Sequence, residues 1–306
     1  MATQTNNGRA FEWAVGLALK LQTNMSIEEN AYSEINEKAF YEIANRDKSD
    51  FLNAATIAIE HIMLKEKGFF ESGNNGLISF NSDTAGKQGD VRDVLITING
   101  KTFGISCKNN HKALKHPRLS RTANFIKEWS IDDFGCSDEY WLIVTTIFDE
   151  LTKIKNDSNG TALWRDVIDK PSRFYWPILD AWSNEISRVC AISEIKEIEL
   201  CKTIISFIVG RFDFYKIIRE GKKRVIVQGL NLNNTLSIKR TKHPTCINAI
   251  NNKNGGQYSK TIIFNRGYSI NFRIHNAESK VTPSLKFDIT AIGLPANEIY
   301  QQTFDL

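Results

Sequence analysis

The chain of 306 residues has no long hydrophobic run, few cysteines, no internal repeat and no low-complexity tract. No segment approaches the roughly 18 consecutive apolar residues of a membrane-spanning helix. The first residues, MATQTNNGRAFEW, lack the basic and apolar regions of a signal peptide. The five cysteines include no CxxC pair, which argues against a disulfide framework and a structural zinc site. These absences predict a soluble, cytoplasmic protein with reduced thiols and no membrane contact.

Charge is distributed unevenly along the chain. Hydrophobic residues make up 42% of the sequence and charged residues 24%, which excludes disorder for most of the chain, and the net charge is only +4. However, residues 101–121 contain six basic residues and no acid, and residues 214–286 contain fourteen basic residues against two acids. Basic tracts attract a polyanion such as DNA, although they also occur as ordinary solvated faces.

Hydrophobic periodicity divides the chain into four regions, with boundaries after residues 49, 150 and 218. Region 1–49 shows helical spacing, with a second helix opening at Ser26 and a capping box to Glu29. Region 50–150 opens with a helix from about Asp50 to Lys67 and continues into strands. Region 151–218 is mainly helical, and region 219–306 alternates and is β-rich. The expected fold class is α/β or α+β, with a mixed sheet flanked by helices and a β-rich C-terminal region.

A β-hairpin is the most informative local feature. Residues 91–98 and 101–108 flank an Asn-Gly pair, the strongest two-residue signal for a type I′ turn. The register of that turn places Asp93 opposite Ser106, with Lys108 one step along on the same face. The opposite face is apolar and is expected to pack inward: Val94, Ile96, Ile98, Phe103, Ile105 and Cys107. The polar side chains Asp93, Ser106 and Lys108 should therefore converge.

This convergence suits metal-dependent hydrolysis of a phosphodiester. Mg²⁺ prefers oxygen ligands and can be held by one or two carboxylates and a substrate phosphate. A lysine beside it can orient or deprotonate the attacking water and offset charge on the phosphate. We take Asp93, Cys107 and Asp90 as candidate metal ligands, although Asp90 has the wrong parity in an extended strand. The alternative is an ordinary surface ion pair between Asp93 and Lys108.

A second acid has to come from outside the hairpin, because Ser106 carries no charge. Glu60 and Glu12, both on predicted helices, are the candidates. Glu60 is preferred because its helix leads into this sheet. For each residue the alternative is an exposed acid on a helix surface.

Two further polar segments suit contacts with double-stranded DNA. The segment after Lys108 is expected to grip phosphates through Asn110, His111, Lys112, Lys115, Arg118 and Arg121. His111 could also donate a proton, or simply be solvated. Residues 269–275 and 285–290 alternate strictly, and their polar face could read G·C pairs in the major groove. Candidate contacts on and beside this face are Arg273, His275, Asn276, Lys280 and Lys286, and the alternative is a solvated face of an antiparallel sheet.

Five stretches together resemble the HaeIII family of type II restriction endonucleases, in the order in which that family has them: residues 8–12, 89–93, 106–120, 213–216 and 272–288. The hairpin is similar to the PD-(D/E)XK nuclease motif, with Ser106 in place of the usual second acid. In the HaeIII family a serine also occupies that position, so by this resemblance Ser106 does not imply a loss of activity.

The resemblance implies Mg²⁺-dependent cleavage of double-stranded DNA at GGCC, blunt between G and C, with a partner methyltransferase protecting host sites. It also implies a PD-(D/E)XK-like catalytic core at residues 50–150 and a DNA-recognition region at 219–306. Two alternatives stay open. One is a nuclease of the same core fold that acts in repair or junction resolution, and the other is a DNA-binding regulator whose nuclease site has decayed.

Overall fold

The computed structural model describes residues 4–72, 75–82, 90–109, 113–115, 117–126, 135–252, 258–295 and 298–306. The chain forms two compact units that are interleaved in sequence. Unit 1 comprises Met1–Lys112, Gly210–Lys242 and Ala296–Leu306, and unit 2 comprises Ala113–Val209 and His243–Pro295. These units cut across the four regions expected from periodicity, because segments far apart in sequence share each sheet.

Unit 1 is built on a mixed sheet. Within the described ranges, seven strands follow the order β1-β2-β3-β4-β7-β8-β13. The pairs β1–β2 and β4–β7 are parallel, and the other neighbours are antiparallel. The strands are β1 Ser26–Ile27, β2 Leu77–Phe80, β3 Val94–Ile98, β4 Lys101–Asn109, β7 Phe214–Glu220, β8 Arg224–Leu230 and β13 Tyr300–Asp305.

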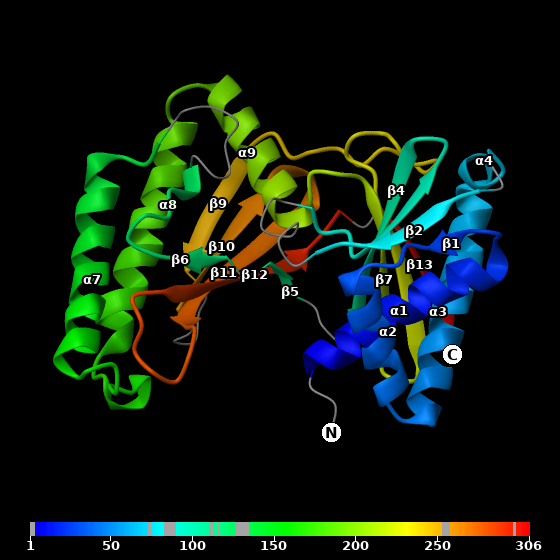
Figure 1. Cartoon of the computed structure of the whole chain (residues 1–306). Helices are drawn as coiled ribbons and strands as arrows, with labels where there is room; N and C mark the ends of the chain where they lie inside the picture. Colours follow the sequence, from blue (N-terminus) through cyan, green and yellow to red (C-terminus); the bar gives the residue numbers. More distant parts are fainter. Residues whose placement is uncertain are drawn as a thin grey trace. The chain divides into compact units, whose positions relative to one another are not determined.

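Helices cover this sheet and close its core. They are α1 Gln4–Gln22, α2 Ala31–Glu42, α3 Asn45–Lys65 and the short α4 Lys67–Phe70. Helix α1 packs against β3 and β4, whereas α3 packs against β7 and β8, and in Figure 1 both lie in front of the sheet. Phe11, Ile59, Ile96 and Ile217 are fully buried in one hydrophobic cluster that these elements share. The apolar stripes of both helices therefore meet the apolar face of the hairpin.

The β3–β4 hairpin has the predicted register. Asn99 and Gly100 have φ angles of 49° and 75°, as a type I′ turn requires. Val94 pairs with Ile105 and Ile98 pairs with Lys101. The residues predicted to face inward are all buried: Val94, Ile96, Ile98, Phe103, Ile105 and Cys107.

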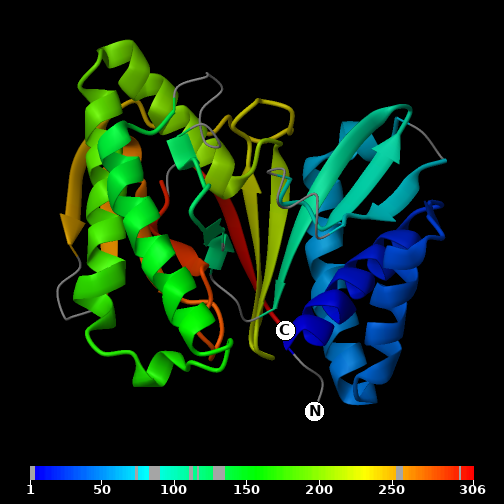
Figure 2. The same ribbon diagram turned by 60° about the vertical axis from the view of Figure 1, so that its left-hand side comes forward.

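Unit 2 contains an antiparallel sheet covered by helices. Its strand order is β5-β12-β11-β10-β9, with β6 also paired to β12. The strands are β5 Ala113–Lys115, β6 Arg118–Leu119, β9 Ile247–Asn252, β10 Ser259–Phe264, β11 Ser269–Asn276 and β12 Leu285–Gly293. The helices are α7 Asp138–Asp157, α8 Trp176–Cys190 and α9 Glu194–Val209, drawn in green in Figure 2. Trp182 of α8 lies 4.5 Å from Phe272 and 5.3 Å from Phe287 between ring centroids, so this helix covers the apolar face of β11 and β12.

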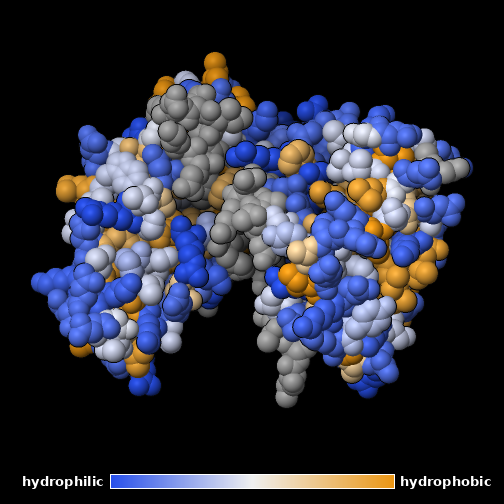
Figure 3. Space-filling model, in the orientation of Figure 1, coloured by the Kyte–Doolittle hydropathy of each residue, from blue (hydrophilic) through white to orange (hydrophobic). Residues whose placement is uncertain are grey.

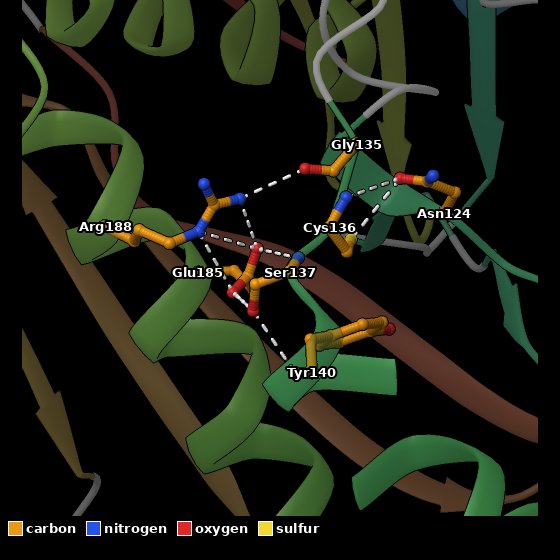
Figure 4. A network of polar contacts seen from close by, with 7 residues as sticks. All are labelled: Asn124, Gly135, Cys136, Ser137, Tyr140, Glu185 and Arg188. Carbon is orange, nitrogen blue, oxygen red and sulfur yellow. Dashed lines mark hydrogen bonds and ion pairs between the residues drawn. The ribbon is translucent and has the colours of Figure 1, made fainter. Parts of the chain in front are cut away.

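A buried carboxylate ties the start of α7 to α8 (Figure 4). Glu185 accepts hydrogen bonds from the backbone and hydroxyl of Ser137 and from the guanidinium of Arg188. Burial alone would raise the pKa of Glu185, but these donors lower it below its usual value. Ser137 also caps α7 by accepting from the Tyr140 N–H. The network therefore joins α7 to α8 in the helical layer that covers the sheet of unit 2.

Several local predictions need correction. Ser26 lies in β1, and α2 begins later, at Ala31, because the side chains of Asn30 and Ser33 form the capping box. The helix expected from Asp50 begins at Asn45 and ends at Lys65. The mainly helical region ends at Val209, and the segment from Phe214 is the strand β7.

The fold class is nevertheless confirmed: helices flank a mixed sheet, and the C-terminal region is β-rich. None of the helices in the described ranges combines the length and hydropathy needed to cross a bilayer. On the face shown in Figure 3, hydrophilic residues predominate and hydrophobic ones are scattered among them.

Candidate active site

Asp93 is the centre of a polar cluster at the end of the β3–β4 hairpin. Its backbone N–H donates to the Ile105 carbonyl at 2.8 Å, which extends the ladder one step beyond β3. Its Oδ2 accepts from the Ser106 hydroxyl at 3.1 Å and the Cys107 N–H at 2.6 Å. Lys108 Nζ donates to the same oxygen at 3.2 Å. The structure thus brings together the three polar residues that the turn register predicted.

Lys108 is held as a cation beside Asp93. The two side chains are 27% and 24% exposed, so their ion pair is largely shielded from water. Burial alone would lower the pKa of Lys108, but the charge and hydrogen bond of Asp93 raise it above the usual lysine value. In this pair Lys108 supplies a fixed positive charge and Asp93 a fixed acceptor.

One oxygen of Asp93 stays available. All three donors use Oδ2, and no group in the described part of the chain forms a hydrogen bond with Oδ1. A carboxylate oriented through one oxygen presents the other in a fixed direction. That arrangement suits a ligand for a divalent cation.

Glu12 of α1 is the second acid of the cluster. Its Oε2 accepts from Asn36 Nδ2 of α2 at 3.0 Å. Burial and the nearby charge of Asp93 raise the pKa of Glu12 to about 8, and Lys108 and Asn36 only partly offset this. Two carboxylates that repel each other in a shielded place form a site that gains stability when a cation binds.

The preference for Glu60 is not supported by its position. Glu60 is exposed on α3, between the buried residues Ile59 and Ile62. Helix α3 packs on β7 and β8, whereas α1 packs on the hairpin strands themselves. Closeness in sequence favoured Glu60, but packing of α1 on β3 and β4 brings Glu12 to Asp93.

Lys216 of β7 was not assigned a role from the sequence and lies at this site. It pairs directly with Ser106 across the parallel β4–β7 ladder, so the two side chains share a face. Burial and repulsion from Lys108 lower the pKa of Lys216 to about 8. The sequence does contain a sign of this role, because Lys216 is a single charged residue within the apolar run Phe214–Ile218.

Asp90 and Cys107 are placed differently from Asp93. Both oxygens of Asp90 accept from Arg92, at 2.7 and 2.8 Å from its guanidinium, so this carboxylate is already neutralised. Arg92 in turn packs over Gly104, where an added Cβ would lie 2.0 Å from its Cδ. The Cys107 thiol is buried on the core face, and burial together with Asp93 raises its pKa well above the usual value. Neither side chain presents a free anionic ligand.

The donor set fits a divalent cation held mainly by oxygen. The described residues contain no cluster of three or more His, Cys, Asp and Glu side chains. Mg²⁺ does not need one, since one or two carboxylates with waters and a substrate phosphate complete its shell. Glu12 and Asp93 are the two carboxylates at hand.

The predicted polar strand face is present in unit 2. Arg273 pairs with Asp288 across β11 and β12, and His275 pairs with Lys286. Arg273 Nη2 donates to Asp288 Oδ2 at 2.8 Å, and His275 Nε2 lies 2.7 Å from the same oxygen. Asp288 therefore holds the Arg273 guanidinium in place. Because the Oδ2 atom of Asp288 already interacts with Arg273 and His275, this oxygen is not available to accept a hydrogen bond from a base.

The other predicted DNA contacts are distributed as follows. Arg118 and Arg121 are exposed and form ion pairs with Glu278 at 3.8 Å and Asp149 at 3.2 Å. The Asn276 amide donates to the Glu278 carbonyl, and Lys280 forms an isolated bridge with Leu163. Lys115 belongs to β5. Asn110, His111 and Lys112 lie outside the described residues.

Sequence comparison places the chain among DNA-cleaving enzymes. Residues 8–295 match the family described as HaeIII restriction endonuclease, so the chain belongs to that family of type II restriction endonucleases. It is similar to the type II restriction enzyme HaeIII of Haemophilus aegyptius, with 33% identity over 99% of each chain. No solved structure matches the chain significantly. The family resemblance inferred from short motifs is confirmed.

Proposed function

We propose that this restriction endonuclease cleaves double-stranded DNA at GGCC, blunt between G and C, by Mg²⁺-dependent hydrolysis at the Asp93 site. Unit 1 supplies the chemistry and unit 2 supplies base recognition. The enzyme acts in the cytoplasm on unmodified DNA, and a partner methyltransferase protects host sites. The observation that carries this proposal is the convergence of Glu12, Asp93 and Lys108 in a member of the HaeIII family.

Each side chain has a separable task. Glu12 and Asp93 would hold Mg²⁺, which polarises the phosphate and lowers the pKa of a bound water. Asp93 is oriented by its three donors, so its free oxygen keeps one direction. Lys108 stays charged and stabilises the negative charge that develops on the phosphate. Ser106 orients Asp93 without adding charge.

A digestion series tests this function. Duplexes containing GGCC, a scrambled site, or a methylated GGCC are incubated with Mg²⁺, Ca²⁺ or EDTA. We expect discrete blunt products only from unmethylated GGCC with Mg²⁺. Smearing of all duplexes would indicate a non-specific nuclease, and a mobility shift without cleavage would indicate a DNA-binding regulator.

Ser106→Ala is expected to lower the cleavage rate only modestly. It removes one of three hydrogen bonds to Asp93 and leaves both carboxylates in place. One such bond contributes about 1 kcal/mol, which corresponds to roughly a 5-fold change in rate. Single-turnover cleavage of a GGCC duplex measures it. A loss as large as that caused by removing a carboxylate would mean that Ser106 itself binds the metal.

Arg273→Ala is expected to weaken binding of the cognate duplex by about 1–3 kcal/mol and binding of a scrambled duplex very little. The physical reason is that Asp288 fixes the guanidinium on the polar strand face, where it can donate to a guanine edge. Titrations of both duplexes in Ca²⁺ at two salt concentrations measure this difference.

Arg121→Ala is the matched control for Arg273→Ala. This exposed arginine of unit 2 is expected to contact a phosphate, so its loss should weaken both duplexes alike and flatten the salt dependence by roughly one unit of slope. If Arg273→Ala also weakened both duplexes equally, its strand would grip phosphates. Base reading would then be sought in residues 276–280.

A further inference from the structure

The site contains a second lysine, Lys216, that has no ion-pair partner among the described residues. Lys216 is only 8% exposed, yet no hydrogen bond or ion pair joins it to any group in the described ranges. Unpaired lysines are rarely buried, because removing an ammonium from water costs several kcal/mol. Packing alone would be better served by an apolar residue of similar volume. The buried ammonium of Lys216 therefore destabilises the fold, and its presence indicates a functional role.

The charges around Lys216 indicate that its missing partner is an anion. It shares a face with its ladder partner Ser106, and the charges of Lys108 and Asp93 both act on it. Asp93 already has Lys108 as its cation. With a divalent cation held by Glu12 and Asp93, the two ammonium groups would leave surplus positive charge. A bound phosphodiester would offset that surplus.

We propose that Lys216 binds a non-bridging oxygen of the scissile phosphate, as a second cationic substrate ligand beside Lys108. This inference rests on the proposed nuclease function and assigns the phosphate to two lysines from neighbouring strands. Lys108 on β4 is anchored by Asp93, whereas Lys216 on β7 receives its partner only when DNA is bound. An ammonium held ready in a shielded site stabilises charge that increases during hydrolysis.

Lys216→Met tests whether the lysine has a structural role. Methionine has a similar length and fills buried space adaptably. Replacing an unpaired buried charge by an apolar side chain should raise the melting temperature of the free protein by about 2 °C or more. A lower melting temperature would show that Lys216 stabilises the fold and would overturn the proposal. Lys101→Met, an exposed change at the start of β4, is the control and should leave stability and cleavage unchanged.

Cleavage and binding test the contact itself. Lys216→Met should slow single-turnover cleavage of a GGCC duplex by about 10²-fold, as the loss of one oxyanion donor does. It should also weaken binding of that duplex in Ca²⁺ by about 10-fold. Wild-type rates in the variant would overturn the proposal. Lys216→Arg keeps the charge and should recover part of the binding.

A duplex with a neutral methylphosphonate at the linkage between the central G and C identifies the phosphate. On that duplex Lys216→Met and wild type should bind equally, because the charged oxygen is gone. A 10-fold loss that persists on the methylphosphonate duplex would place Lys216 at another phosphate and overturn the assignment. If wild type bound the duplexes without cutting any of them, the proposed nuclease function would fail. The binding comparison would still decide the Lys216 contact.

Discussion

Asp93→Asn and Lys108→Ala are each expected to slow cleavage of a GGCC duplex by at least about 10²–10⁴-fold. Asp93→Asn should leave DNA affinity largely intact, whereas Lys108→Ala should weaken binding in Ca²⁺ by about 10-fold, because Lys108 is also a cationic ligand of the phosphate. Asp93→Asn keeps the shape of the side chain but removes the charge that a divalent cation requires. Lys108→Ala removes the cation beside the phosphate and leaves Asp93 with two of its three donors. Single-turnover cleavage in Mg²⁺ and titration in Ca²⁺ measure the two quantities separately.

Lys101→Ala is the control for Lys108→Ala, because both lysines belong to β4 but only Lys108 lies at the cluster. Unchanged cleavage by Lys101→Ala would show that losing a positive charge anywhere on β4 is not enough to slow cleavage. Near wild-type turnover in either Asp93→Asn or Lys108→Ala would remove the hairpin from the mechanism. Asp93 and Lys108 would then form an ordinary surface ion pair, which is the alternative interpretation of these two residues.

The hairpin could be predicted because its information is local. An Asn-Gly pair fixes the turn type, the turn fixes the register, and the register fixes which side chains share a face. Asp93, Ser106 and Lys108 therefore followed from sequence separations of no more than fifteen residues. The same holds for β11 and β12, where strict alternation placed Arg273 and His275 on the polar side.

The second acid could not be predicted in this way, since it depends on how helices pack. Glu12 lies 81 residues before Asp93, and it reaches the site only because α1 packs on β3 and β4. Glu60 and Glu12 both look like acids on amphipathic helices. Which helix covers which strands depends on the complete core, and sequence proximity favoured Glu60, which is exposed on α3.

Lys216 was missed for a related reason. The parallel pairing of β4 with β7 joins strands that are separated by all of the first part of unit 2. Residues 214–218 were assigned to the mainly helical region, so no strand was predicted there, and periodicity does not show which strand a strand joins. A lysine among apolar residues, in a stretch that also contributes to the family resemblance, was the local indication that the segment carried a function.

Glu12→Gln is expected to reduce cleavage by about 10²-fold or more, whereas Glu60→Gln should stay close to wild type. The two changes are chemically identical and both lie on helices of unit 1, so each controls for the other. Glutamine keeps the hydrogen-bonding shape near Asn36 but cannot supply the negative charge that a metal site needs. Equal, small effects from both would mean that neither helix supplies the acid.

Stability in EDTA gives an independent test of Glu12. Its pKa in the folded protein is about 8, against 4.5 for an unperturbed glutamate, so between these values the folded state binds more protons than the unfolded state. The metal-free wild type should therefore lose stability as the pH rises from about 4.5 to about 8. Glu12→Gln lacks this titration and should show a smaller loss between pH 6 and pH 8.5, while Glu60→Gln follows wild type. A loss of the same size in Glu12→Gln would show that Glu12 is not held in its buried position beside Asp93 in solution, because burial first and repulsion from Asp93 second raise its pKa.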